Sequence, residues 1–137
     1  MNMDFINNFG DRYMKTPGGQ GAFLAGVLLG YMALKQVGGN EDNICNSPLF
    51  KQIQFGRLDA KGLKKLLSRV PQLIAAYRED MGRSARTLTC IAAKAGELLL
   101  MGEDEELGTE GNFAFAVGFT NANEYYWKIL QSKEHED

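Results

Sequence analysis

Residues 21–36 read GAFLAGVLLGYMALKQ, a run in which apolar side chains fall on almost every side of a helix. A helix that is hydrophobic all round must be covered on every face, so it belongs in the middle of a helical bundle. Its apolar part, residues 22–34, spans 13 residues, whereas about 20 residues are needed to cross a bilayer. We therefore expect a buried central helix over residues 20–36 and no membrane partner.

Proline, glycine and capping residues divide the rest of the chain into further helices. Pro48 suits the first position of one helix, while Asp59 and Thr109 suit the N-caps of two others. Gly26 and Gly30 lie four residues apart, a spacing that permits another helix to approach closely. No alternating strand pattern and no repeat is present, so we predict an all-α fold: a single helical bundle of five to six helices in one domain, residues 1–137. The expected elements are a helical arm within residues 1–15, helices at residues 20–36, 48–54, 59–77, 82–101 and 110–131, an acidic loop at residues 102–106 and a frayed tail at residues 132–137.

The clearest amphipathic pattern lies in residues 59–77. On a wheel of about 100° per residue, the apolar side chains share one sector and the basic side chains lie opposite. The apolar set is Leu63, Leu66, Leu67, Val70, Leu73, Ile74 and Tyr77, and the basic set is Lys61, Lys64, Lys65 and Arg69. Pro71 falls inside this pattern and should either kink the helix or divide it near Val70. Because the apolar sector stays in register beyond Pro71, we favour a kink.

Charge is strongly segregated along the chain, although the net charge is only −2. Residues 51–94 contain ten Lys or Arg and three Asp or Glu, a net charge of +7, whereas residues 96–137 have a net charge of −8. This polarity favours a polyanionic partner, or acidic and basic faces that meet in an assembly. We find no base-reading motif, so nucleic acid would be held by its backbone. The candidate nucleic-acid-binding residues are Lys61, Lys64, Lys65, Arg69, Arg83, Arg86 and Lys94, with Lys51 and Arg57 as additional basic contacts.

The sequence offers no group of residues typical of catalysis, metal binding or a cofactor. The only histidine, His135, lies in the polar tail, so neither a catalytic triad nor a zinc site can be assembled. Cys45 and Cys90 lie far apart and are interpreted as reduced thiols of a cytoplasmic protein. The acidic run at residues 103–106 lacks the ligand spacing of a calcium loop and is interpreted as a solvated loop. We therefore expect neither an enzyme nor a cofactor-binding protein.

Several blocks of the sequence resemble the C-terminal region of the large subunit of the type I-B CRISPR Cascade complex. They are TPGGQGAFLAGVLLGY at residues 16–31 with Lys35 and Gln36, PLFKQIQFGRLD at residues 48–59 with LKKLL at residues 63–67, and FAFAVGF at residues 113–119. The blocks are hydrophobic and glycine patterns that extend over roughly residues 16–126. The chain starts with Met1 and then this C-terminal pattern, without the PAM-reading part of a large subunit. The resemblance therefore implies a Cascade small subunit, translated from within the large-subunit gene of a prokaryote.

The resemblance implies a non-catalytic role in antiviral defence. Such small subunits support the crRNA–target heteroduplex and the displaced strand of the R-loop, while base pairing supplies sequence specificity. The implied partners are the crRNA-bearing backbone subunits, the large subunit, target DNA, and other copies of the chain, whose acidic and basic parts would meet head to tail. The alternative from another class is a helical protein–protein interaction module whose basic face binds an acidic protein.

Overall fold

The computed structural model describes residues 1–102 and 107–131. This part of the chain forms eight α-helices and four short 3-10 helices, with no strand among the described residues, so the predicted all-α bundle is confirmed. The acidic loop at residues 103–106 and the tail at residues 132–137 lie outside the described residues. The elements are η1 (Asp4–Phe9), η2 (Tyr13–Lys15), α1 (Pro17–Gln36), η3 (Glu41–Asn46), α2 (Pro48–Gln52), α3 (Ala60–Ser68), α4 (Val70–Ala76), α5 (Arg78–Met81), η4 (Gly82–Ser84), α6 (Ala85–Met101), α7 (Gly108–Thr120) and α8 (Ala122–Gln131).

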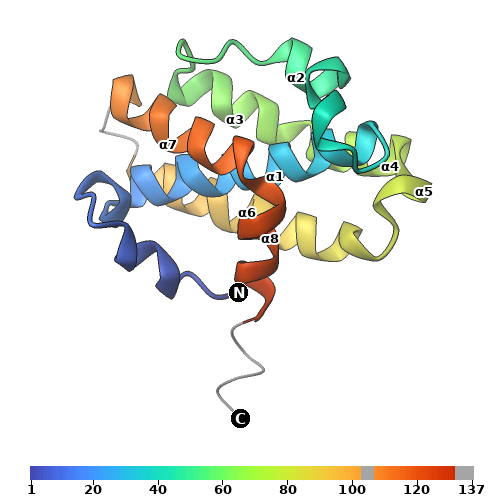
Figure 1. The fold of residues 1–137 in the computed structure, drawn as a ribbon. Coiled ribbons are helices and arrows are strands. Elements are labelled where there is room, and N and C mark those ends of the chain that lie inside the picture. Colours follow the sequence, from blue (N-terminus) through green and yellow to red (C-terminus); the bar gives the residue numbers. More distant parts are fainter. Residues whose placement is uncertain (103–106, 132–137) are drawn as a thin grey trace.

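Helix α1 is the centre of the bundle, as its all-round apolar pattern predicts (Figure 1). Sixteen of its 20 residues are buried, and its most extensive contacts are with α7 and α6. The helix begins at Pro17, three residues before the start expected at residue 20. Thr16 Oγ1 accepts a hydrogen bond from the Gly19 N–H at 3.0 Å, and Pro17 at the first position needs no partner for a backbone N–H. The Thr-Pro-Gly-Gly segment is therefore the start of the helix.

The backbones of α1 and α7 meet at glycines. A Cβ atom on Gly26 would clash with the carbonyl oxygen of Phe115, and a Cβ atom on Gly118 of α7 would clash with the carbonyl oxygen of Phe23. The close approach predicted from Gly26 and Gly30 is thus confirmed, and α7 is the helix that approaches. Each interior glycine costs about 0.5–1 kcal/mol of helix stability relative to Ala, which the tighter packing offsets.

The helix expected over residues 59–77 is divided, so the prediction of a kink is wrong. Arg69 ends α3 with its N–H bonded to the Leu66 carbonyl at 3.1 Å, and its own carbonyl accepts from the Leu73 N–H in α4 at 3.0 Å. Pro71 has no N–H to continue the hydrogen-bond ladder of α3, but it fits the second position of a new helix. Apolar residues that stay on one side of a helical wheel therefore do not ensure a continuous series of backbone hydrogen bonds.

The expected last helix is also divided, at Asn121. The Asn121 Nδ2 donates to the Val117 carbonyl at 2.9 Å, and Thr120 Oγ1 donates to the Ala116 carbonyl at 2.8 Å. Side-chain donors therefore bind backbone carbonyls at the end of α7. The helix begins at Gly108, with Leu107 at the N-cap position, so Thr109 is not its N-cap. These two divisions, together with the short helix α5 between two expected helices, explain why the bundle contains more helices than expected.

Residues 1–15 are packed onto the bundle and do not form a free arm. They contain the 3-10 helices η1 and η2, and the side chain of Ile6 is fully buried. The Asn2 N–H donates to the Ile129 carbonyl of α8 at 2.8 Å. Ile6 and the partly buried Phe5 therefore pack with the core of the bundle, whereas Phe9 is 37% exposed.

Candidate nucleic-acid interface

The connection between α2 and α3 alternates inward and outward side chains. Ile53 is buried, and the Phe55 ring packs 5.1 Å from the Phe119 ring of α7, centroid to centroid. Gln52 and Gln54, the neighbours of these apolar residues, are exposed. Ile53 follows the last residue of α2, Gln52, and has an extended backbone. Since successive side chains of extended backbone point to opposite sides, burial of Ile53 turns the Gln54 amide toward solvent.

Asn112 of α7 holds the end of this connection. Its side chain is only 8% exposed, and its Oδ1 accepts from the Leu58 N–H at 2.8 Å while its Nδ2 donates to the Leu58 carbonyl at 2.9 Å. The next residue, Asp59, accepts from the Gly62 N–H at 2.6 Å through Oδ1, which confirms it as the N-cap of α3. The start of α3 is therefore fixed from both α7 and its own cap.

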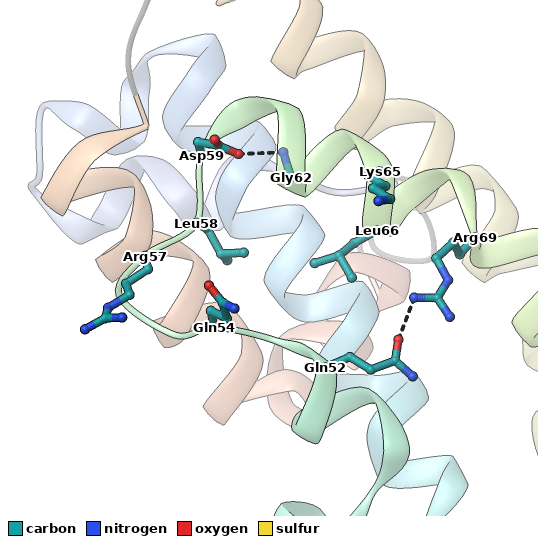
Figure 2. A pocket seen from close by; sticks show the side chains of 9 residues that line it. All are labelled: Gln52, Gln54, Arg57, Leu58, Asp59, Gly62, Lys65, Leu66 and Arg69. Carbon is teal, nitrogen blue, oxygen red and sulfur yellow. Dashed lines mark hydrogen bonds between the residues drawn. The ribbon is translucent and has the colours of Figure 1, made fainter.

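A cleft of about 350 Å³ lies between this connection and α3 (Figure 2). Figure 2 shows Arg57 and Arg69 at opposite ends, with the side chains of Gln54, Leu58 and Leu66 between them. The Arg69 Nη1 donates to the Gln52 Oε1 at 2.6 Å, which holds the guanidinium group against the connection. The lining residues are Gln52, Gln54, Arg57, Leu58, Asp59, Gly62, Lys65, Leu66 and Arg69.

The cleft carries more positive than negative charge. It is lined by three cationic side chains, Arg57, Lys65 and Arg69, and by one carboxylate, Asp59, whose Oδ1 already serves the N-cap. Among the described side chains the one ion pair joins Lys94 Nζ to Glu97 Oε2, at 3.8 Å. The three cations therefore have no described carboxylate partner, and a ligand's negative charge would be attracted to them.

The sequence of residues 2–133 matches the family model described as the C-terminal domain of the CRISPR-associated protein TM1802. The chain belongs to this CRISPR-associated family. The recognition of a CRISPR-associated protein from the sequence blocks is therefore confirmed. No curated protein and no solved structure matches the chain.

The structure brings together only part of the predicted basic site of this CRISPR-associated chain. Lys65 and Arg69 line the cleft, joined by Arg57, which the sequence placed only among the additional contacts. Lys61 and Lys64 lie on the same helix but do not line the cleft. Leu63 and Leu67 are buried as predicted, so the basic side chains of α3 face away from the core.

The other predicted basic residues lie elsewhere. Lys51 is exposed on α2 outside the cleft. Arg83 and Arg86 are exposed on η4 and the first turn of α6, and neither lines the cleft. Lys94 is half-buried and paired with Glu97, so its charge is partly neutralised. The nine candidates therefore do not form one continuous site around the cleft.

The aromatic residues of α7 and α8 do not line the cleft. Tyr126 is 2% exposed and stacks on Tyr31 with ring centroids 3.7 Å apart, and burial raises its pKa above the ordinary value for tyrosine. Trp127 is 49% exposed on α8, where its Nε1 donates to the Asn123 Oδ1 at 3.3 Å. The cleft therefore lacks an aromatic platform for stacking bases.

Sequence reasoning missed Gln52, Gln54 and Asn112. The two glutamines are neutral, so a search by charge passes over them, although their alternation with Ile53 and Phe55 was a usable signal. Asn112 contacts a backbone 54 residues away, and no local pattern marks such a contact.

Residues 1–102 and 107–131 were also compared with the requirements of a metal site and a membrane span. No group of three or more His, Cys, Asp or Glu side chains there is arranged to hold a metal ion. Cys45 and Cys90 are exposed free thiols. Within the same residues, no helix combines the length and the apolar character that a membrane span needs.

Proposed function

We propose that this chain is a non-catalytic, backbone-binding helical subunit of a CRISPR interference complex. The complex is a type I Cascade of subtype I-B, in which the chain serves as the small subunit. It supports the crRNA–target heteroduplex and the displaced DNA strand of the R-loop, in the cytoplasm of a prokaryote. Membership of a CRISPR-associated family supports the setting, and the charge of the cleft supports the role.

The observation that carries this proposal is the group of three cations without described carboxylate partners around one cleft. Of these, Lys65 and Arg69 lie four residues apart and repel each other by a few tenths of a kcal/mol, and phosphate groups remove that repulsion. Phosphate contacts position a protein on nucleic acid without reading its sequence. In CRISPR effector complexes base pairing with the guide RNA supplies the sequence specificity, so such a role needs charge and shape alone.

Two of the partners in this proposal are implied by the resemblance to the Cascade large subunit, and the charge pattern supports contact between copies of the chain. The crRNA-bearing subunits and the large subunit would hold the chain beside the guide. Residues 96–137, with their net charge of −8, suit contact with the basic part of the next copy of the chain, head to tail. Heterologous contacts of this kind repeat along a complex and so allow several copies to be placed in a row.

Charge reversal in the assembled complex tests the proposal. Changing Lys61, Lys64, Lys65 and Arg69 to Glu should weaken target-DNA binding and R-loop formation, while the helical circular-dichroism signal stays unchanged. A charge-matched control reverses four cations outside residues 51–94: Arg12, Lys15, Lys35 and Lys128. Equal target-DNA affinity of the α3 variant and the native complex would contradict the proposal. Tight binding of an acidic protein without nucleic-acid binding would favour the interaction module.

A further inference from the structure

The size of the cleft limits what it can hold. A volume of about 350 Å³ is at the low end of the range for ligand pockets, which is about 300–1,000 Å³. Such a hollow has room for a nucleotide but not for a duplex. A nucleic acid that enters it must therefore present one nucleotide at a time.

Duplex and single strand differ in what they can place in a hollow. In a duplex the bases are paired and stacked inside, and a protein surface meets phosphates along a convex cylinder. An unpaired strand can splay a base or sugar into a protein cavity while the flanking phosphates stay at its rim. The positions of Arg57 and Arg69 at opposite ends of the cleft, with half-buried Leu58 and Leu66 between them, match the second arrangement (Figure 2).

We propose that the cleft holds one unpaired nucleotide of a single-stranded DNA or RNA segment, with its flanking phosphates on Arg57 at one end and on Lys65 and Arg69 at the other. The sugar or base lies against Leu58 and Leu66, and the Gln54 amide meets its polar edge. This inference rests on the proposed function and names the form of nucleic acid that the site takes.

Gln52 is a positioning residue in this arrangement. It accepts one hydrogen bond from Arg69 at 2.6 Å and leaves the other guanidinium donors available. A carboxylate at the same place would also hold Arg69, but it would cancel the charge that phosphate needs. A neutral amide holds the guanidinium group in place and leaves its positive charge intact.

Two double variants of the full chain separate the cleft from a general basic surface. Lys65→Gln with Arg69→Gln removes two charges inside the cleft, and Lys61→Gln with Lys64→Gln removes two charges from the same helix outside it. The probes, each labelled with fluorescein, are a short oligothymidylate, an oligouridylate of equal length and a hairpin duplex. Their binding is measured by fluorescence anisotropy at several salt concentrations. The cleft variant should lose about tenfold in single-strand affinity, and the slope of log affinity against log salt should fall by about 1.4, or roughly 0.7 per lost contact. The control variant should lose less than about threefold.

Side-chain amide signals give a second, local readout. In two-dimensional NMR spectra of the native chain, the amide signals of Gln52 and Gln54 should move during titration with the single-stranded probes. The signal of Gln72, which is exposed on α4 outside the cleft, is the matched control and should stay in place.

The outcomes distinguish this inference from the proposed function. Equal losses in the two double variants, or equal affinity for the hairpin and the single strands, would overturn the cleft site but leave backbone binding intact. A lack of binding to all three probes by the chain and by the assembled complex would overturn both. A preference for the oligothymidylate or the oligouridylate that the cleft variant loses supports the cleft and indicates which of the two nucleic acids it takes.

Discussion

Replacement of Asn112 by Ala tests how the cleft is held in place. Asn112 connects α7 to Leu58 across 54 residues of sequence, and it makes three hydrogen bonds, two to the Leu58 backbone and one to the Gly108 carbonyl at 2.8 Å. The substitution leaves the Leu58 N–H and carbonyl without these partners. Gly108 is exposed, so water replaces the third bond.

The expected loss follows from those two backbone groups. A protein hydrogen bond contributes about 0.5–1.5 kcal/mol net, and a buried group left without a partner costs about 1–3 kcal/mol. Leu58 is half-buried, so some water reaches its backbone and the lower part of the second range applies. We expect the free energy of unfolding to fall by about 2–3 kcal/mol, a large part of the roughly 5–15 kcal/mol of a typical domain.

Urea unfolding followed by circular dichroism measures this loss, and amide hydrogen exchange at Leu58 locates it. Asn121→Ala is the matched control, because Asn121 also donates to a backbone carbonyl of α7 but is exposed, so its loss should stay below about 1 kcal/mol. Asn112→Ala should also weaken single-strand binding, since Gln54 and Arg57 lie on the connection that Asn112 holds. Equal stability losses in the two variants, with unchanged exchange at Leu58, would refute the reasoning.

Three further predictions concern stability. Gly26→Ala places a Cβ against the Phe115 carbonyl oxygen and should lower the unfolding free energy by about 1–3 kcal/mol, whereas Gly96→Ala, with no atom within 4 Å of the new Cβ, should raise it by about 0.5–1 kcal/mol. Thermal unfolding compares the two, and effects of the same sign would contradict the packing argument. Asp59→Ala removes the N-cap of α3 and should cost about 1 kcal/mol in urea unfolding, while an unchanged midpoint would show that the cap contributes nothing. Burial raises the pKa of Tyr126 in the folded state, so the stability it contributes is present below about pH 10 and is lost as the pH rises past that value. The free energy of unfolding, measured from neutral to alkaline pH, should therefore decline less steeply in Tyr126→Phe than in the native chain. Identical pH profiles of the two proteins would contradict a contribution from ionisation of Tyr126.

Patterns that depend on neighbouring residues were readable from the sequence. The all-round apolar character of residues 21–36 predicted the central helix, since a helix without a polar face needs cover on every side. Asp59 and Pro48 were predicted at helix starts because capping depends on residues two or three positions away. The outward position of the basic side chains on α3 follows in the same way from the helical period.

Features that depend on distant residues were decided only by the tertiary structure. The helical periodicity placed four basic residues on one face: Lys61, Lys64, Lys65 and Arg69. Of these, only Lys65 and Arg69 line the cleft beside the α2–α3 connection. Where that connection lies depends on Asn112, whose contact with Leu58 spans 54 residues. The sequence by itself therefore determined the all-helical fold, the central position of α1 and the segregation of charge, because helical periodicity, burial and charge can be read along the chain, but not the divisions at Arg69 and Asn121. Only the packing of α7 against the α2–α3 connection decided which cations share a cleft, because a contact across many residues leaves no local pattern.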